Sequence, residues 1–520
     1  MNLAYLIDRG AKWYPDNIAV VDENGSYLVK EVYSRANQLA NALAKLGNKK
    51  GDRLGIVCRN CVEYIETDFA IYKSGLIRVA LNPRLSPKEI LTMLNDSGIK
   101  TVLISSDHAD MVEKSRPELK TVQHIIVVGE PRQGMLQFQE LIKNEPTEFK
   151  AVDVDENDIA VLFYTGGTTG IPKGAMHTHK SVITVTTNLQ GEAFHLTSKD
   201  AFLSAGTLAH ANGYRVFPAW LKGAKHVLVN GFELPDILET IQKEKITILT
   251  TVPTTLQRLC EFPDVNKYNL SSLRLISYGA SPTPVELLKK ALTIFGKRLA
   301  QIYGQAEAPI TIALLRPEEH FLDGEGTEAQ VKRLASVGRP YITCEVRVVN
   351  NEGKDVKPGE VGEIIVRSPH CMVGYWNRPD ATTETLRNGW IYTGDLATVD
   401  NKDYIFIVDR AKDIIISGGY NVYAREVEEV LYTHPAVREA AVVGIPDNKW
   451  GEAVKAIVAL KPGAKATEKE LIDYCKQNMT SYKKPQSVEF MPELPKSAVG
   501  KILKRELKEK YWQGYERRVH

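Results

Sequence analysis

Cysteine is scarce in this sequence, and its one close pair has no counterpart. There are six cysteines in 520 residues. Cys58 and Cys61 form a CxxC pair, whereas a zinc site needs a second pair of similar spacing. Cys58 ends the apolar run LGIVC, so we expect buried thiols rather than ligands. Sparse cysteine usage is typical of a reducing compartment.

Long apolar runs and an excess of one charge are also missing. No stretch of about 20 apolar residues is available to span a bilayer. Asp8 and Arg9 interrupt the N-terminus, where a signal peptide would need an apolar region. The formal net charge is +2, which provides no basic field for nucleic acid. We therefore expect a cytoplasmic protein with no transmembrane segment and no nucleic-acid partner.

The length and the pattern of the chain predict several structural units. A single core stops growing at roughly 250–300 residues, so 520 residues require at least two domains. From about residue 100, short apolar runs such as 124–128 and 158–164 alternate with amphipathic helical patterns, which indicates α/β architecture. After about residue 335, short strands separated by turn-rich stretches indicate antiparallel hairpins or a small β-barrel. A further change of pattern places a domain boundary near Arg410.

The stretch YTGGTTGIPKG, residues 164–174, combines bare backbone with hydroxyls and one lysine. Its glycines allow backbone N–H groups to point into one concavity, which suits an anion. It follows the predicted strand at 158–164 and precedes a predicted helix at 180–190. A P-loop is excluded because Lys173 stands between Pro172 and Gly174, whereas that motif needs Gly-Lys-Ser/Thr. We interpret the stretch as a polyphosphate cradle.

Six ordered motifs carry a resemblance to a known family. They are TGGTTGIPKG (165–174), YGQAE (303–307), GYWNRPDAT (374–382), GWIYTGD (389–395), DRAKDIIISGGYNVYAREVE (409–428) and PKSAVGKILK (495–504). Together they resemble the acyl-adenylate-forming superfamily of acyl-CoA synthetases, luciferases and peptide-synthetase adenylation domains, over essentially the whole chain. The resemblance implies an α/β N-terminal domain of residues 1–410, with two α/β subdomains and a small antiparallel β-barrel, and a small mobile α+β C-terminal domain of residues 411–520.

The resemblance also implies an ATP site and its residues. Glu307 matches the family's magnesium-binding glutamate, with Thr168 beside the ion, and Mg²⁺ offsets the repulsion between ATP and a carboxylate. Lys501 matches the catalytic lysine, which neutralises charge as pyrophosphate leaves. The implied nucleotide-binding residues are Thr165, Gly166, Gly167, Thr168, Thr169, Lys173, Gly279, Ala280, Ser281, Tyr303 (stacked on adenine), Gly304, Ala306, Asp395 (on the ribose hydroxyls) and Arg410 (also reaching the ribose).

Two positions depart from the family pattern. Gly166 replaces a usual serine or threonine, although Thr165, Thr168 and Thr169 remain. Ala306 replaces a usual threonine whose hydroxyl would contact the α-phosphate, and its loss costs about 1 kcal/mol or more. We interpret this as slower or re-tuned chemistry, and a non-catalytic adenylate-binding protein stays open as a distant alternative.

A second half-reaction follows from the same resemblance. A thiol is expected to attack the acyl-adenylate after the C-terminal domain rotates about a hinge at Lys412. Gly418, Gly419 and Tyr420 match the segment that lines the pantetheine tunnel, where two glycines allow close approach of the backbone. Coenzyme A is the expected acceptor, and a carrier-protein thiol is the alternative. Family members are often dimers, so a homodimer is possible.

The sequence constrains the identity of the carboxylic-acid substrate only in part. Residues 201–230 contain no Asp or Glu, which argues against an amino-acid substrate because a buried ammonium needs a partner. LAHANGY (208–214) matches the segment that borders the acyl tunnel, with His210 at the meeting of the carboxylate and thiol paths and Tyr214 as an aromatic gate. Small residues around them indicate space for a sizeable apolar acid. The sequence thus predicts an AMP-forming acyl-CoA synthetase for a medium- or long-chain fatty acid or an aryl or alicyclic acid.

Overall fold

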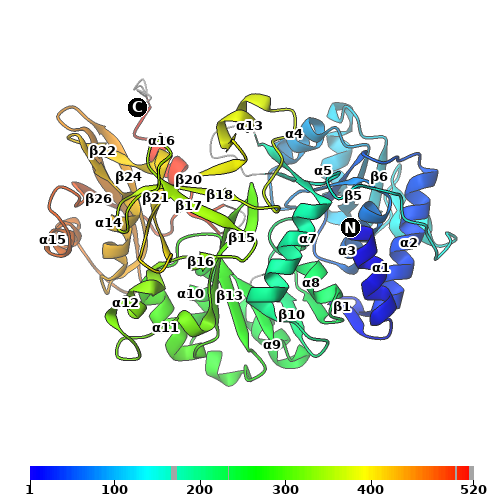
Figure 1. Cartoon of the computed structure of the whole chain (residues 1–520), viewed down its shortest axis with the longest axis horizontal. Helices are drawn as coiled ribbons and strands as arrows, with labels where there is room; N and C mark the ends of the chain where they lie inside the picture. Colours follow the sequence, from blue (N-terminus) through cyan, green and yellow to red (C-terminus); the bar gives the residue numbers. More distant parts are fainter. Residues whose placement is uncertain (165–171, 232, 498–499, 514–520) are drawn as a thin grey trace.

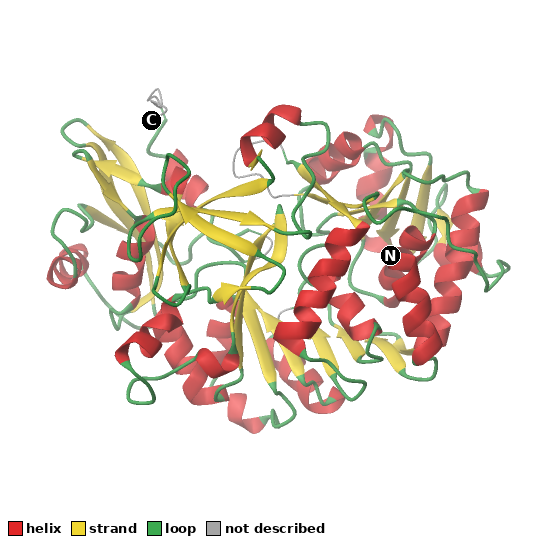
Figure 2. Ribbon diagram, in the orientation of Figure 1, coloured by secondary structure: helices red, strands yellow, loops and turns green. Residues whose placement is uncertain are grey.

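The structure is a computed structural model that describes residues 1–164, 172–231, 233–497 and 500–513. Two α/β layers form the large body on the right and bottom of Figure 1, and a smaller lobe that ends in the C-terminus lies on the left. Figure 2 shows helices packed beside both large sheets, with an antiparallel sheet between these layers and the small lobe. The mixed α/β prediction is confirmed.

The first large sheet has seven strands in the order β7-β6-β5-β3-β4-β8-β9. All neighbours are parallel except β8 and β9, which are antiparallel. The strands are β3 (Arg53–Val57), β4 (Ile77–Ala80), β5 (Thr101–Ser105), β6 (His124–Val128), β7 (Leu136–Gln137), β8 (Ile159–Tyr164) and β9 (Gly174–Thr178). The α/β alternation therefore begins before residue 100, earlier than predicted.

The second large sheet has nine strands in the order β16-β15-β14-β13-β12-β10-β11-β1-β2. Its central strands are parallel, and β2, β15 and β16 are antiparallel additions at its edges. The strands are β1 (Ile18–Asp22), β2 (Gly25–Leu28), β10 (Ala201–Ser204), β11 (Lys225–Leu228), β12 (Ile248–Thr251), β13 (Leu275–Gly279), β14 (Leu299–Gln305), β15 (Ala308–Leu315) and β16 (Arg339–Pro340). The N-terminal strand β1 thus completes a sheet built mostly from later sequence.

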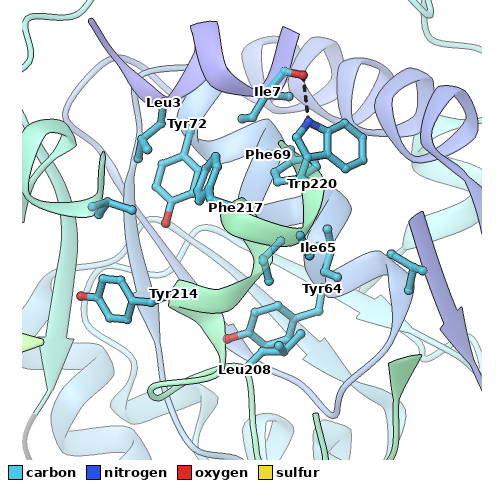
Figure 3. Close-up of a cluster of buried hydrophobic side chains, with 14 of the residues drawn as sticks. Leu3, Ile7, Tyr64, Ile65, Phe69, Tyr72, Leu208, Tyr214, Phe217 and Trp220 are labelled. Carbon is cyan, nitrogen blue, oxygen red and sulfur yellow. Dashed lines mark hydrogen bonds between the residues drawn. The ribbon is translucent and has the colours of Figure 1, made fainter. Parts of the chain in front are cut away.

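One hydrophobic core lies between these two sheets. Every residue of α3 (Val62–Lys73) is buried in it, including charged ones, so its polar side chains need internal partners. On one side of α3 the Phe69 ring packs edge-on against Trp220 at 4.6 Å, and the Trp220 indole N–H donates to the Ile7 carbonyl at 3.0 Å (Figure 3). These contacts fix the position of α8 (Val216–Trp220).

The remaining helices cover the sheets and follow local end signals. At α4, for example, Ser86 and Glu89 form a capping box, Pro87 opens the helix and Gly98 ends it with a φ of 63°. The helices are α1 (Leu3–Trp13), α2 (Val29–Lys45), α4 (Pro87–Ser97), α5 (Ala109–Lys114), α6 (Phe138–Ile142), α7 (His179–Asn188), α9 (Leu234–Glu244), α10 (Pro253–Glu261), α11 (Val285–Phe295), α12 (Glu328–Lys332), α13 (Pro379–Thr385), α14 (Ala424–Tyr432), α15 (Glu468–Asn478) and α16 (Lys504–Glu509).

Two smaller sheets complete the chain. The first is antiparallel, as predicted, with β17 (Glu345–Val349), β18 (Gly362–Arg367), β19 (Leu386–Arg387), β20 (Trp390–Val399) and β21 (Ile405–Arg410). The second comprises β22 (Ile415–Ser417), β23 (Tyr420–Val422), β24 (Val437–Asp447), β25 (Gly451–Leu460) and β26 (Ser487–Phe490). One core cluster is drawn wholly from Ile415 and later residues, and the domain boundary near Arg410 stays a prediction.

The predicted order of strand, glycine loop and helix needs a correction. The strand β9 follows the loop, with Tyr164 paired to Gly174, and α7 begins only at His179. On its other side β9 pairs with the segment around Tyr375, where the Met176 amide donates to the Gly374 carbonyl at 2.9 Å. Pairing on both edges makes residues 174–178 a strand although their sequence has little strand character.

The described residues can be compared with the expectations of buried thiols and of no transmembrane segment. Cys58 and Cys61 are buried free thiols with their sulfur atoms 3.8 Å apart, as expected. Among the parts of the chain that the structure describes, no helix has the length and apolar character to cross a bilayer. The same residues contain no cluster of three or more His, Cys, Asp or Glu side chains suited to a metal ion.

Candidate active site

A large cavity of about 2690 Å³ lies between the N-terminal sheets and the C-terminal lobe. It is lined from both sides by residues that the sequence singled out, namely His210, Tyr214, Gly279, Ala280, Ser281, Tyr303, Gly304, Ala306, Glu307, Asp395, Arg410, Lys412 and Lys501. The fold therefore brings together residues that are up to 291 positions apart (501 − 210) in the chain. Thr165, Gly166, Gly167, Thr168 and Thr169 lie outside the described residues.

Asp395 is the centre of a buried polar group on one side of this cavity. Its Oδ2 accepts a hydrogen bond from the Tyr303 hydroxyl at 2.6 Å, and its Oδ1 lies 3.1 Å from Nε of Arg410. Asp395 and Arg410 are directly opposite each other on β20 and β21. Burial, with Asp395 nearby, raises the pKa of Tyr303 well above its ordinary value, so this hydroxyl stays a donor. The pair on β20 and β21 is suited to recognise a polyol such as ribose.

Beside the polar group around Asp395, the backbone at Gly279 and at Gly304 packs tightly against neighbouring backbone. A Cβ on Gly279 would lie 2.2 Å from the Ile302 carbonyl oxygen, and one on Gly304 would lie 2.3 Å from the Ile310 amide nitrogen. Ala280 has a φ of 72°, in the left-handed region that costs a residue with a side chain about 1–2 kcal/mol. Such strain is characteristic of ligand-binding segments. The role of the segment as a wall of a nucleotide pocket stays a prediction.

Glu307 stands in the turn between β14 and β15. Its Oε1 accepts a hydrogen bond from the Tyr375 hydroxyl at 2.5 Å. The Nζ of Lys173 lies 5.3 Å from the centre of the same Tyr375 ring, within the range of a cation–π contact. Tyr375 therefore contacts both Glu307, the predicted Mg²⁺ ligand, and Lys173, a predicted ligand of the phosphates. The sequence analysis assigned it no role, although it lies in the motif GYWNRPDAT.

Ala306 lacks the hydroxyl of the usual threonine, but its backbone carbonyl oxygen is held by a hydrogen bond. Nε2 of the buried His177 lies 2.8 Å from the Ala306 carbonyl oxygen. Burial lowers the pKa of His177 to about 4, so the ring is neutral at pH 7 and donates from Nε2. This contact comes from β9, whose existence the sequence analysis did not predict.

Lys501 reaches the cavity from the C-terminal lobe. Its loop is closed by hydrogen bonds between the Ser497 amide and the Lys501 carbonyl at 2.8 Å and between the Lys501 amide and Ser497 Oγ at 3.2 Å. Gly500 approaches Thr254 of the N-terminal part so closely that a Cβ there would lie 2.9 Å from the threonine Oγ1. The side chain lines the cavity and is exposed to solvent within it. Desolvation by the cavity walls, followed by repulsion from Arg410, lowers the pKa of Lys501 to about 8.

His210 and Tyr214 form one wall with Phe163. Ring centres are 5.9 Å apart between Phe163 and His210 and 6.0 Å apart between Phe163 and Tyr214. Burial, then the charges of Lys501 and Arg78, lowers the pKa of His210 to about 4. The imidazole is therefore neutral at physiological pH and is available as a hydrogen-bonding group.

Behind this wall lies a buried ion pair that sequence reasoning missed. Arg78 donates from Nε to Asp68 at 2.6 Å, and from Nη2 to the Tyr64 hydroxyl at 3.0 Å and the Leu208 carbonyl at 2.9 Å. Arg78 and Asp68 are each 4% exposed. The contact to Leu208 fixes the start of the segment that carries His210. No local motif marks Arg78, because its partners come from α3 and from a distant loop.

The predicted acceptor segment lies elsewhere in this conformation. Gly418 and Gly419 have φ values of 58° and 80° in the turn between β22 and β23. Tyr420 is 61% exposed, and its ring centre lies 4.9 Å from that of Tyr482. These three residues do not line the cavity. Lys412, in contrast, does line it directly after Arg410, and burial lowers its pKa.

Comparison with known proteins identifies the family of the chain. Residues 7–376 match the family model described as AMP-binding enzyme, and residues 426–501 match the one described as AMP-binding enzyme C-terminal domain. The chain belongs to the AMP-binding enzyme family. The resemblance to adenylate-forming enzymes that the motifs carried is thereby confirmed, and so is the expectation of an enzyme.

Relatives of this AMP-binding enzyme extend over nearly its whole length. A medium/long-chain-fatty-acid–CoA ligase, FadD8, from Mycobacterium tuberculosis is 36% identical over 504 residues, covering 94% of this chain and 86% of the relative. A feruloyl-CoA synthase from an Amycolatopsis species is 35% identical over 505 residues, covering 97% and 98%. The crystal structure of the anthranilate CoA ligase AuaEII in complex with anthranoyl-AMP superposes with a TM-score of 0.90 at 30% identity, covering 98% and 97%.

Proposed function

We propose that this enzyme joins a carboxylic acid to coenzyme A, consuming ATP and releasing AMP and pyrophosphate. The observation that carries the proposal is the convergence of Lys501, Glu307 and Asp395 on one cavity between the two parts of the chain. In the first step a carboxylate oxygen bonds to the α-phosphorus as the bond to pyrophosphate breaks. In the second, the thiol sulfur bonds to the acyl carbon, AMP leaves, and the thiol proton is released.

Each charged group has a task in the first step. Asp395 would accept hydrogen bonds from the ribose hydroxyls, with Arg410 beside it. The ammonium of Lys501 would offset the negative charge that accumulates on the α-phosphate and on pyrophosphate. Glu307 fits Mg²⁺, because that ion binds proteins through one or two carboxylates together with substrate phosphates. When bound, the ion neutralises phosphate charge.

The second step requires a different position of the C-terminal lobe. With Lys501 in the cavity, the turn at Gly418 and Gly419 lies outside it. We propose that residues 411–520 rotate about Lys412, which removes Lys501 and brings the glycine turn to the thiol path. Departure of the lysine would favour the second step, since a cation that stabilises pyrophosphate release has no role in thiol attack.

For the acid, we propose a fatty or an aryl or alicyclic carboxylate without an α-amine. The absence of Asp and Glu from residues 201–230 leaves an ammonium without a partner there. Small residues beside the rings of His210 and Tyr214, such as Ala205, Gly206 and Ala211, line the cavity and leave room for an apolar chain or ring. The relatives named above include ligases of both substrate classes.

A direct assay tests the proposal. The protein is incubated with ATP, Mg²⁺ and separate pools of fatty, benzoic, cinnamic and alicyclic acids, with and without CoA, while AMP and pyrophosphate are quantified. AMP release that depends on one pool and on CoA, and that falls sharply in Lys501→Ala, supports the ligase. Lys510→Ala is the matched control, because Lys510 lies on the same tail in a surface ion pair with Glu489.

The other outcomes point to the alternatives. Acid-dependent exchange of pyrophosphate into ATP without CoA-dependent AMP release would favour a carrier-protein thiol as the acceptor. Binding of ATP with no turnover of any pool would contradict the proposal and favour a non-catalytic adenylate-binding protein.

A further inference from the structure

The loop that carries Lys501 is anchored by an ion pair at each of its ends. Before the loop, Nζ of Lys496 lies 2.7 Å from Oε1 of Glu439 on β24. After the loop, Nζ of Lys504 lies 2.7 Å from Oε1 of Glu428 on α14. The two contacts tie the loop to one strand and one helix of the C-terminal lobe.

The anchor after the loop is largely buried. The residue Glu428 is 8% exposed, and its Oε1 also accepts a hydrogen bond from the Val442 amide of β24 at 2.7 Å. The helix α16 begins at Lys504 and packs against β24, while α14 packs against β21 (Figure 1). A buried carboxylate needs a charged partner and hydrogen bonds, so Lys504 and Glu428 fix each other's position.

Lys504 also faces the strand that carries Arg410. Asp409 precedes Arg410 on β21, is 6% exposed, and accepts a hydrogen bond from the Arg410 amide at 2.8 Å. Burial raises the pKa of Asp409, and the charge of Lys504 opposes this rise. The charges of Glu428, Asp409 and Asp413 all act on Lys504, and these four residues line the same cavity. Lys504 therefore interacts with carboxylates on both sides of the predicted domain boundary.

A second lysine of the same helix provides the contrast. Lys508 lies one turn further along α16 and also lines the cavity. Its Nζ lies 3.3 Å from Oε1 of Glu452 on β25, within the C-terminal lobe. Lys504, in contrast, lies three residues after Lys501 and interacts with β21 through Asp409.

We propose that Lys504 is a positioning residue for Lys501, because it connects the end of the Lys501 loop both to Glu428 and to β21 at Asp409. The proposal rests on the proposed ligase function and gives Lys504 a part in its first step. The bridge would hold the Lys501 ammonium at a fixed distance from Arg410. Without it, two buried carboxylates would repel each other and the loop would lose one anchor. In the second step Lys501 has left the cavity, so the bridge has no part there.

Separate measurement of the two steps tests this inference. The probe acids are octanoate and cinnamate, replaced by the best acid of the active pool if neither reacts. Because small displacements of a reacting group are costly, Lys504→Met should slow single-turnover formation of the acyl-adenylate roughly tenfold or more at saturating ATP. The KM for ATP should change less than about threefold. Conversion of the supplied acyl-adenylate and CoA to acyl-CoA should keep its rate. Lys504→Arg should retain most of the first-step rate, because the charge remains.

A double variant separates positioning of Lys501 from a general effect on the fold. If Lys504 acts through Lys501, the first step in Lys501→Ala with Lys504→Met should be as slow as in Lys501→Ala alone, because residues that act as a unit are not additive. This comparison needs only the first step, so it holds for any thiol acceptor.

Two single variants complete the design. Lys508→Met is the matched control and should leave the first step unchanged. Glu428→Gln can still accept from the Val442 amide but no longer pairs with a charge, and it should slow the first step as Lys504→Met does. It tests the bridge even if Lys504→Met fails to fold.

Two results would overturn the inference while leaving the ligase intact. One is an equal loss in both steps for Lys504→Met and Glu428→Gln, as a purely structural role requires. The other is a double variant slower than Lys501→Ala by the full effect of Lys504→Met. Absence of pyrophosphate release by the intact enzyme with both probe acids and with the pools described above would instead contradict the ligase itself.

Discussion

The Tyr375 hydroxyl donates a hydrogen bond to Oε1 of Glu307 at 2.5 Å across 68 residues of sequence. The carboxylate that we assign to Mg²⁺ is thus oriented by a neighbour from a different motif. A group that orients a metal-binding carboxylate commonly influences the affinity of the site. We therefore propose Tyr375 as a positioning residue for Glu307.

Removing this donor should weaken the response to Mg²⁺. A hydrogen bond to a charged group contributes about 1.5–3 kcal/mol, so we expect Tyr375→Phe to raise the Mg²⁺ concentration required for half-maximal pyrophosphate release roughly tenfold. The measurement is a Mg²⁺ titration at fixed ATP. Tyr5→Phe, on an exposed tyrosine of α1, is the control. An unchanged Mg²⁺ dependence in Tyr375→Phe would show that Glu307 needs no such support.

Lys501 should give the first step an alkaline limit. A lysine pKa lowered to about 8 means that the free enzyme loses the ammonium as pH rises through this value, so charge assistance is full below it. We expect kcat/KM for pyrophosphate release to fall above about pH 8, since this parameter reports the free enzyme. In Lys501→Arg the guanidinium stays charged, and the decline should move beyond pH 9. The same limit in both proteins would assign it to another group.

The buried pair of Arg78 and Asp68 should matter more for stability than for ATP binding. Breaking a buried pair by removing one partner costs about 3–5 kcal/mol, so Arg78→Met should lower the urea midpoint markedly. The double variant Arg78→Met with Asp68→Leu should recover part of this loss because no unpaired charge remains. Urea unfolding monitored by circular dichroism makes the comparison. Equal midpoints for the single and the double variant would argue against the pair.

Ala306 offers a gain-of-function test. Its backbone is already held by the contact to His177, so Ala306→Thr should add a hydroxyl without moving the peptide. A hydrogen bond from this hydroxyl to the α-phosphate of about 1 kcal/mol corresponds to roughly a fivefold faster first step. Single-turnover formation of the acyl-adenylate measures it, with Ala306→Val as the isosteric control. A rate that does not exceed that of the control would mean that the hydroxyl finds no partner.

The sequence by itself was sufficient to identify the family, the α/β architecture and the chemical groups that line the cavity. Glu307, Asp395, Arg410 and Lys501 were found because each lies in a short motif whose residues are neighbours along the chain. Buried strands such as 124–128 were equally visible, because their apolar pattern is local.

Only the tertiary structure revealed the contacts between residues that lie far apart in the sequence. Tyr375 meets Glu307, and Arg78 meets Asp68 and Leu208, through contacts between distant elements that leave no local pattern. Residues 174–178 became a strand because two neighbouring segments offered hydrogen bonds to them, which overrides weak local preference.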